Sequence, residues 1–326
     1  MQRRDFIALG FSAVAMSSLA ARGQAVMPTV GFVGSDTPDL YADRLRAFRL
    51  GLKVTGFFEG QNVAVEYRWA EGRNESLPTL TAELLRRQVA VIVATTTPST
   101  LAAKASTTTT PIVFFVAGDP VHLGLVESLN RPGGNLTGAT TLTLEVGAKR
   151  LELLRELVPA ATVIVALVNP TSPNLAATQT KDLEAAARAF GLQLHVLEAS
   201  TDPDFETAFR KMDKLGAQAL VVTSDSFFFS RSQKIAALAT KHRIPAIYGF
   251  RECALAGGLI SYGGTLEESH RWIGVYTGRI LKGESPTNLP VQQSTKVELI
   301  VNFKAATAIG LQVPPALIAR ADEVIE

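Results

Sequence analysis

The sequence predicts an α/β protein made of two successive units, each a parallel β-sheet with helices on both faces. From Thr29 onward, short runs rich in β-branched residues alternate with segments of helical periodicity. The strand-like runs are almost continuously apolar, which is typical of parallel strands buried on both faces. The alternation pauses at a turn cluster over 131–135 and then resumes. With 326 residues, 47% of them hydrophobic and 19% charged, the chain is long enough for about two domains of ordinary size.

The first segment, residues 1–25, has the anatomy of an export signal. Arg3 and Arg4 precede an apolar run over 6–20 that serines interrupt, and small residues follow at Ala-x-Ala-like positions. The order Arg-Arg-Asp-Phe-Ile resembles a twin-arginine signal, and a Sec signal that holds two arginines or an uncleaved anchor remain alternatives. We therefore expect residues 1–25 to be a signal peptide of twin-arginine or Sec type, and the protein to be exported, most simply to the periplasm.

The first α/β unit is expected between Thr29 and the turn cluster. Leucine or phenylalanine recurs at 45, 48 and 52, and leucine recurs at 77, 80 and 84, in each case at the spacing of one helix face. The predicted strands of this unit are 29–34, 63–69, 89–95 and 111–116.

The second unit repeats this pattern after 136–141. Its predicted strands are 162–169, 192–199, 219–225, 245–250 and 258–263, and its predicted helices are 172–190, 203–215 and 227–243. The chain then continues with a helix near 266–282, which Gly283 ends, and with two strand-like segments, 289–293 and 297–303.

Composition and motifs argue against several classes of function. Without residues 1–25, which hold three arginines and one aspartate, 29 basic and 29 acidic residues remain, so we expect no nucleic-acid partner. The single cysteine, Cys253, excludes an intrachain disulfide and a cysteine-cluster metal site. No phosphate loop, dinucleotide-binding fingerprint, nucleophile elbow or His-Glu-x-x-His motif occurs. We expect no catalytic residues, no metal and no cofactor, although residues distant in sequence can converge in an enzyme.

Polar residues gather just beyond the predicted strands. In open parallel sheets ligands bind at the carboxyl ends of the strands, where helix N-termini attract carboxylates and other anions. The Thr-rich segment 95–99 fits either an anion cradle or a simple helix cap. The candidate ligand-binding residues are Ser35, Tyr41, Thr96, Thr97, Ser99, Ala117, Asp119, Ser172, Asn174, Asp225, Ser226 and Phe250.

Two further features leave alternatives open. Asp225 and Glu252 either pair with a ligand ammonium group or cap helices. The three consecutive phenylalanines at 227–229 cannot all face one direction on a helix. Either one of them points into a cleft, where it stacks on a ligand, or all three pack in the core and between the domains.

Long segments of the chain resemble a known family. These include FVGSDTPDLYADRLRAFRLGL (32–52), FVAGDPVHLGLVESLNRPGGNLTG (115–138) and SDSFFFSR (224–231). They are similar to substrate-binding components of ABC transporters with the type I periplasmic binding protein fold, in the group that includes tryptophan- and tyrosine-type binding proteins. The resemblance covers essentially all of the chain after the signal. Many members carry a His-Pro element after the first strand, whereas this chain reads Asp36-Thr37-Pro38-Asp39, so the resemblance does not establish an aromatic amino acid as ligand.

The resemblance implies two Rossmann-like lobes joined by three crossover strands. Lobe one is expected to comprise 28–138 and 265–292, and lobe two 139–264 and 293–326. By position, the segment after the third strand and the loop Ala117–Asp119 form the lobe-one side of a ligand site that holds a carboxylate or polar head. The lobe-two side is expected to comprise Ser172, Asn174, Asp225, Ser226 and Phe250.

The function that follows from this resemblance is solute capture. We expect a monomeric periplasmic receptor that closes on a small molecule, an amino acid or another aromatic or carboxylate compound, and delivers it to an ABC permease in the inner membrane. A periplasmic sensor module, or a soluble enzyme on a doubly wound fold, is the alternative.

Overall fold

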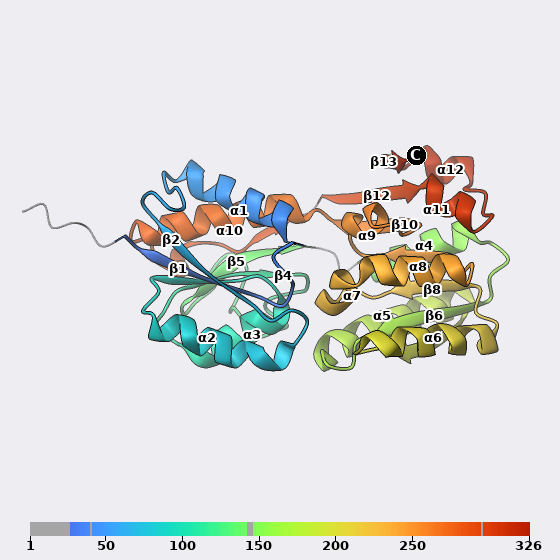
Figure 1. Cartoon of the computed structure of the whole chain (residues 1–326), viewed down its shortest axis with the longest axis horizontal. Helices are drawn as coiled ribbons and strands as arrows, with labels where there is room; N and C mark the ends of the chain where they lie inside the picture. The colour runs from blue at the N-terminus through green and yellow to red at the C-terminus, as the bar shows by residue number, and fades with distance from the viewer. Residues whose placement is uncertain (1–26, 40, 142–145, 295) are drawn as a thin grey trace, which may run out of the picture.

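The chain folds into two α/β lobes that lie side by side (Figure 1). The computed structural model describes residues 27–39, 41–141, 146–294 and 296–326. The predicted signal peptide, 1–25, lies outside the described residues. One lobe holds a six-stranded sheet and the other a seven-stranded sheet. This arrangement confirms the predicted fold class.

The sheet of lobe one is parallel throughout. Its strand order is β11–β5–β4–β3–β1–β2. The strands are β1 (Thr29–Gly34), β2 (Ala64–Trp69), β3 (Val91–Ala94), β4 (Ile112–Val116), β5 (Leu136–Thr141) and β11 (Gln292–Ser294). The central strands β3, β4 and β5 are buried along their whole length, whereas the edge strand β2 is half-buried, as the apolar runs predict.

Helices cover both faces of this sheet. On one face, α1 (Ala42–Val54) packs against α10 (Leu266–Leu281), and on the other α2 (Leu77–Arg86) packs against α3 (Thr97–Ser106). The 3-10 turns η1 (Asn74–Ser76) and η2 (Pro286–Asn288) complete the lobe. The helices α1 and α10 approach closely at Gly51 and Gly274, where an added Cβ would overlap the backbone of the facing helix. This close approach fixes the position of α1.

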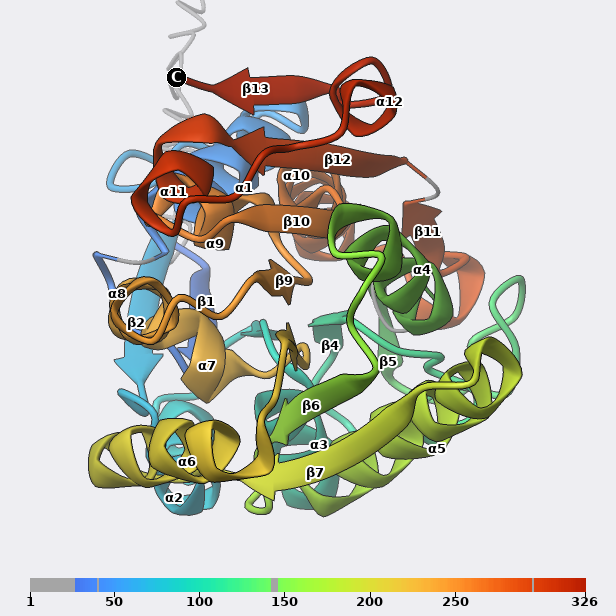
Figure 2. The same ribbon diagram turned by 90° about the vertical axis from the view of Figure 1, so that its right-hand side faces the viewer.

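The sheet of lobe two has the order β13–β12–β10–β9–β8–β6–β7, in which only the β10–β12 pair is antiparallel. Figure 2 shows β12 and β13 beside the C-terminus at one end of this sheet and β7 at the other. The strands are β6 (Val163–Val168), β7 (Gln193–Glu198), β8 (Ala219–Val222), β9 (Ala246–Tyr248), β10 (Ile260–Gly264), β12 (Val297–Asn302) and β13 (Glu323–Ile325).

The helices of lobe two also pack on both faces of their sheet. One apolar cluster unites the sheet with α4 (Gly147–Leu157), α5 (Pro173–Phe190), α11 (Phe303–Ala308) and α12 (Pro315–Ile318). The opposite face carries α6 (Asp202–Leu215), α7 (Ser226–Ser230) and α8 (Ser232–Lys241), while α9 (Arg251–Leu255) packs against β10 and β12. The single helix predicted over 227–243 is therefore two helices that meet at Arg231.

The chain passes between the lobes three times. It crosses after Thr141, after Gly264 and after Ser294, where strands of one sheet give way to elements of the other lobe. The lobe boundaries predicted at 138/139 and 292/293 fall inside β5 and β11, because β5 pairs with β4 and β11 pairs with Ala139–Thr141 in the first sheet. Within the described ranges, no helix is long and apolar enough to span a bilayer.

Candidate ligand site between the lobes

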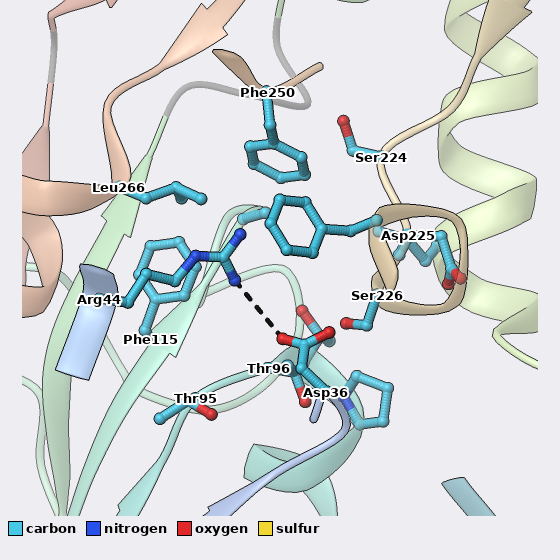
Figure 3. A pocket seen from close by; sticks show the side chains of 15 residues that line it. Asp36, Arg44, Thr95, Thr96, Phe115, Ser224, Asp225, Ser226, Phe250 and Leu266 are labelled. Carbon is cyan, nitrogen blue, oxygen red and sulfur yellow. Dashed lines mark hydrogen bonds and ion pairs between the residues drawn. The ribbon is translucent and has the colours of Figure 1, made fainter. Parts of the chain in front are cut away.

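A small cavity lies where the two lobes meet (Figure 3). The space at its centre is about 40 Å³, room for about three water molecules. Aromatic and aliphatic side chains supply most of its walls, and polar groups from both lobes face it. Lobe one contributes Asp36, Arg44, Thr95, Thr96, Thr97, Pro98, Phe115, Ala117 and Leu266, and lobe two contributes Leu175, Ser224, Asp225, Ser226, Phe229 and Phe250.

Half of the candidate residues chosen from the sequence line this cavity. They come from both units and from different strand ends, as expected for the open edge of parallel sheets. These residues are Thr96, Thr97, Ala117, Asp225, Ser226 and Phe250.

The start of α3 shows the helix-cap alternative. The Ser99 amide donates to Thr96 Oγ1 at 3.2 Å, and the Thr96 amide donates to Ser99 Oγ at 3.0 Å, which makes a capping box. The Ser35 hydroxyl lies 2.8 Å from Thr96 Oγ1 and completes this buried cluster. Ser35 and Ser99 therefore support the helix end and lie behind the cavity wall.

Four other candidates lie away from the cavity lining. Tyr41 is fully buried, and its hydroxyl bonds to His270 Nε2 in the core between α1 and α10. The exposed Asp119 accepts a hydrogen bond from the Val121 amide at 2.8 Å within its own turn. Ser172 is the buried N-cap residue of α5, and Asn174 is exposed on the first turn of that helix.

Asp225 lines the cavity as a helix cap. One oxygen, Oδ1, accepts hydrogen bonds from the Phe227 amide at 2.8 Å and from Asn169 Nδ2 at 2.9 Å. Figure 3 shows its carboxyl group turned away from Arg44. Burial raises the pKa of Asp225, and its hydrogen bonds oppose that rise.

The three phenylalanines at 227–229 are all buried, but they pack in different places. The rings of Phe227 and Phe228 pack on Phe205 of α6, at centroid distances of 5.4 and 5.8 Å. Phe229 instead lines the cavity and meets the ring of Phe250 edge-on at 5.7 Å. Both expectations hold in part, since all three are buried and one faces the site.

Arg44 is a charged cavity residue that strand-end reasoning missed. It projects from α1 of lobe one, and its guanidinium carbon lies 3.9 Å from the ring centroid of Phe229 in lobe two. Its Nη1 pairs with Asp36 Oδ2 at 3.4 Å, and the side chain is only 8% exposed. A signal was present in the sequence, because Arg44 shares the helical spacing of the buried residues Phe48 and Gly51.

Asp36 is the second charged residue of the site. Burial raises its pKa from 3.8 to about 6, the positive charge of Arg44 opposes the rise, and the carboxylates of Asp225 and Glu252 add to it. Because Asp225 and Glu252 belong to lobe two, carboxylates of the second lobe act electrostatically on Asp36 of the first. In the described part of the chain, no group of three or more His, Cys, Asp or Glu side chains is placed to hold a metal ion.

Comparison with known proteins agrees with this architecture. Residues 36–325 match the family described as ABC transporter substrate binding protein, and the chain belongs to that family. The chain is thus the solute-binding component of a transport system of this type.

Individual proteins and solved structures are similar to this chain. The chain is 26% identical over 269 residues to a tyrosine-binding protein of Clostridioides difficile, covering 82% of this chain and 76% of that protein. A Streptococcus pneumonia ABC domain in complex with L-Trp shares the fold with a TM-score of 0.82 at 21% identity, over 91% of this chain and 99% of that chain. A ligand-free, open substrate binding protein with adhesive properties from Clostridium difficile gives a TM-score of 0.62 at 24% identity, over the same shares of the two chains.

Proposed function

We propose that this protein is an exported, monomeric receptor that captures one small organic solute between its lobes in the periplasm and presents it to an ABC permease. Family membership supports the solute-binding role, and the signal-like residues 1–25 support export. The observation that carries the proposal is the cavity, which lies between the lobes and is lined with polar and aromatic side chains from both.

A site shared by two lobes favours capture by closure. A ligand shifts the equilibrium toward the closed form only if it binds that form more tightly, which requires contacts from both sides. Here Phe115, Leu266, Phe229 and Phe250 lie in the cavity wall, and one apolar cluster continues from lobe one into lobe two. Separation of the lobes would expose these side chains to water.

We infer that the two lobes are in a closed arrangement. The whole chain superposes better on the relative in complex with L-Trp than on the ligand-free, open relative, with TM-scores of 0.82 and 0.62. The ligands printed for the relatives, tyrosine and L-Trp, support an amino acid or another aromatic or carboxylate compound as the solute.

Native mass spectrometry of the protein purified from cells tests this function. We expect a complex with one small molecule that is lost on denaturation. Ser226→Trp fills the cavity from the lobe-two side and should abolish the complex, whereas Thr207→Trp, on the exposed face of α6, should retain it. Equal ligand occupancy in the two variants would place the ligand elsewhere and contradict the proposal.

A further inference from the structure

The guanidinium of Arg44 has one unused edge. Nη1 faces Asp36, but Nε and Nη2 are buried and form no hydrogen bond with any described residue. These two nitrogens lie along one edge of the planar guanidinium and point N–H bonds outward in parallel. A buried charged donor without an acceptor is strongly unfavourable, so the bound state of the receptor must supply one.

Two other buried polar atoms at the same cavity are also without partners among the described residues. They are Oδ1 of Asp36 in lobe one and Oγ of Ser224 in lobe two. Figure 3 shows both side chains around the cavity that Arg44 enters. Residues that carry an unpartnered polar atom therefore line the cavity from both lobes, with Ser224 Oγ itself lying against Gly249.

We propose that Arg44 binds the carboxylate of the solute through its Nε–Nη2 edge, and this inference rests on the proposed function. A carboxylate accepts two parallel hydrogen bonds from one guanidinium edge, and the planes of the two groups match. The apolar part of the solute contacts Phe115, Phe229 and Phe250, which line the cavity, and the Phe229 ring lies over the guanidinium. Arg44 is thus the residue that selects for an anionic head group.

The charges around Arg44 restrict the solute further. Asp36 pairs with the same guanidinium, and the carboxylates of Asp225 and Glu252 act on Asp36 electrostatically. These carboxylates would repel a doubly charged phosphate more strongly than a singly charged carboxylate, so of the two anions the site disfavours the phosphate. The free Asp36 Oδ1 accepts a hydrogen bond from a donor on the solute, such as an α-amino or α-hydroxy group.

This placement differs from the anion cradle expected at the start of α3. There, the capping box already uses the amides of Thr96 and Ser99. The helix end therefore offers an anion fewer free donors than its Thr-rich sequence suggests, whereas Nε and Nη2 of Arg44 have no hydrogen-bond partner among the described residues.

The test is calorimetric titration of the full chain with a defined panel. The panel comprises the twenty common amino acids, their 2-oxo and 2-hydroxy acids, and the primary amide of each, together with neutral sugars and polyamines. We expect wild-type protein to bind at least one carboxylate and to bind the matching amide at least about tenfold more weakly, as loss of charge-assisted hydrogen bonds predicts. An amide that binds as tightly as its acid would overturn the proposal.

Variants on α1 separate the role of Arg44 from general charge. Arg44→Gln should weaken carboxylate binding by about 10- to 100-fold. Arg44→Lys keeps the positive charge but lacks the two parallel N–H donors, so its affinity for the carboxylate should lie between those of wild type and Arg44→Gln. Arg46→Gln is the matched control, because Arg46 lies on the same helix with an exposed side chain, and its affinity should equal that of wild type.

The outcomes distinguish this inference from the function on which it rests. Tight binding of a sugar or a polyamine, unchanged by Arg44→Gln, would reject the carboxylate assignment and leave the receptor function intact. Absence of binding by wild-type protein across the panel, with no co-purified solute in native mass spectrometry, would reject both. If Arg44→Gln fails to fold, the acid and amide pairs on wild-type protein still decide the matter.

Discussion

Replacing Asp36 with asparagine should change how the stability of the protein depends on pH. The buried carboxyl has a pKa of about 6 in the folded protein, against an ordinary value of 3.8. The folded state therefore holds the proton more tightly than the unfolded state does. The resulting destabilisation is absent well below pH 4, grows as the pH rises through the window between the two pKa values, and is complete above about pH 6.

The size of the effect follows from the shift. A difference of about two pKa units corresponds to about 3 kcal/mol, which wild-type protein loses as the pH rises through the window and Asp36→Asn does not. The comparison isolates Asp36, because the other titrating groups are common to both proteins. The substitution also removes the ion pair between Asp36 and Arg44. This does not complicate the comparison of pH profiles, because protonated Asp36 in the wild-type protein lacks the charge for that pair as well.

Urea unfolding followed by tryptophan fluorescence measures this difference. Both tryptophans, Trp69 and Trp272, lie in lobe one, which also holds Asp36. The free energy of unfolding of the variant should gain about 2 kcal/mol relative to wild type between about pH 4 and pH 7.5, because part of the effect is already present at pH 4. Parallel pH profiles, or a relative gain by wild type, would show that the ion pair with Arg44 outweighs the cost of burial and would refute the reasoning.

Three further predictions concern packing and reactivity. Gly51→Ala should lower the free energy of unfolding, measured in urea, by about 1–3 kcal/mol, because the added Cβ meets the α10 backbone. The control Gly147→Ala should change the free energy of unfolding little, because its Cβ would have its nearest neighbour at 3.9 Å. Equal effects of the two substitutions would contradict the close contact between α1 and α10. Cys253 should resist Ellman's reagent at pH 8 until urea unfolds the protein, since burial raises its thiol pKa to about 12, and rapid labelling of native protein would contradict this. Tyr41→Phe should cost about 1 kcal/mol of stability by removing the hydroxyl bound to His270, and an unchanged urea midpoint would show that bond to be dispensable.

The fold could be predicted because strands that are buried on both faces have an almost entirely apolar sequence. The fully buried strands β4 and β8 are apolar at nearly every position, and only a sheet covered on both faces requires that. The break between α7 and α8 left no comparable mark, because serines on both sides of Arg231 also occur in continuous helices. Exact lobe boundaries depend on pairing between β5 and β11, which are far apart in the sequence.

The site could be predicted only where strand ends contribute to it. Neighbouring residues at the end of a strand point to opposite sides, so the choice between Ser35 and Asp36 depended on local geometry. Ser35 turned toward the cap of α3, and Asp36 turned into the cavity. Arg44 comes from a helix, and Phe115 from within a strand, so a search of loops alone misses both.

The central claim is that a solute binds between the lobes and holds them together. Spin labels on cysteines introduced at the exposed positions Glu75 in lobe one and Lys181 in lobe two measure the distance between the lobes by pulsed electron resonance, while buried Cys253 stays unlabelled. With the co-purified solute removed, the distances should be broad and long, and saturating solute should replace them with one shorter, narrow distribution. A distribution that stays unchanged while the solute binds fully would contradict the account.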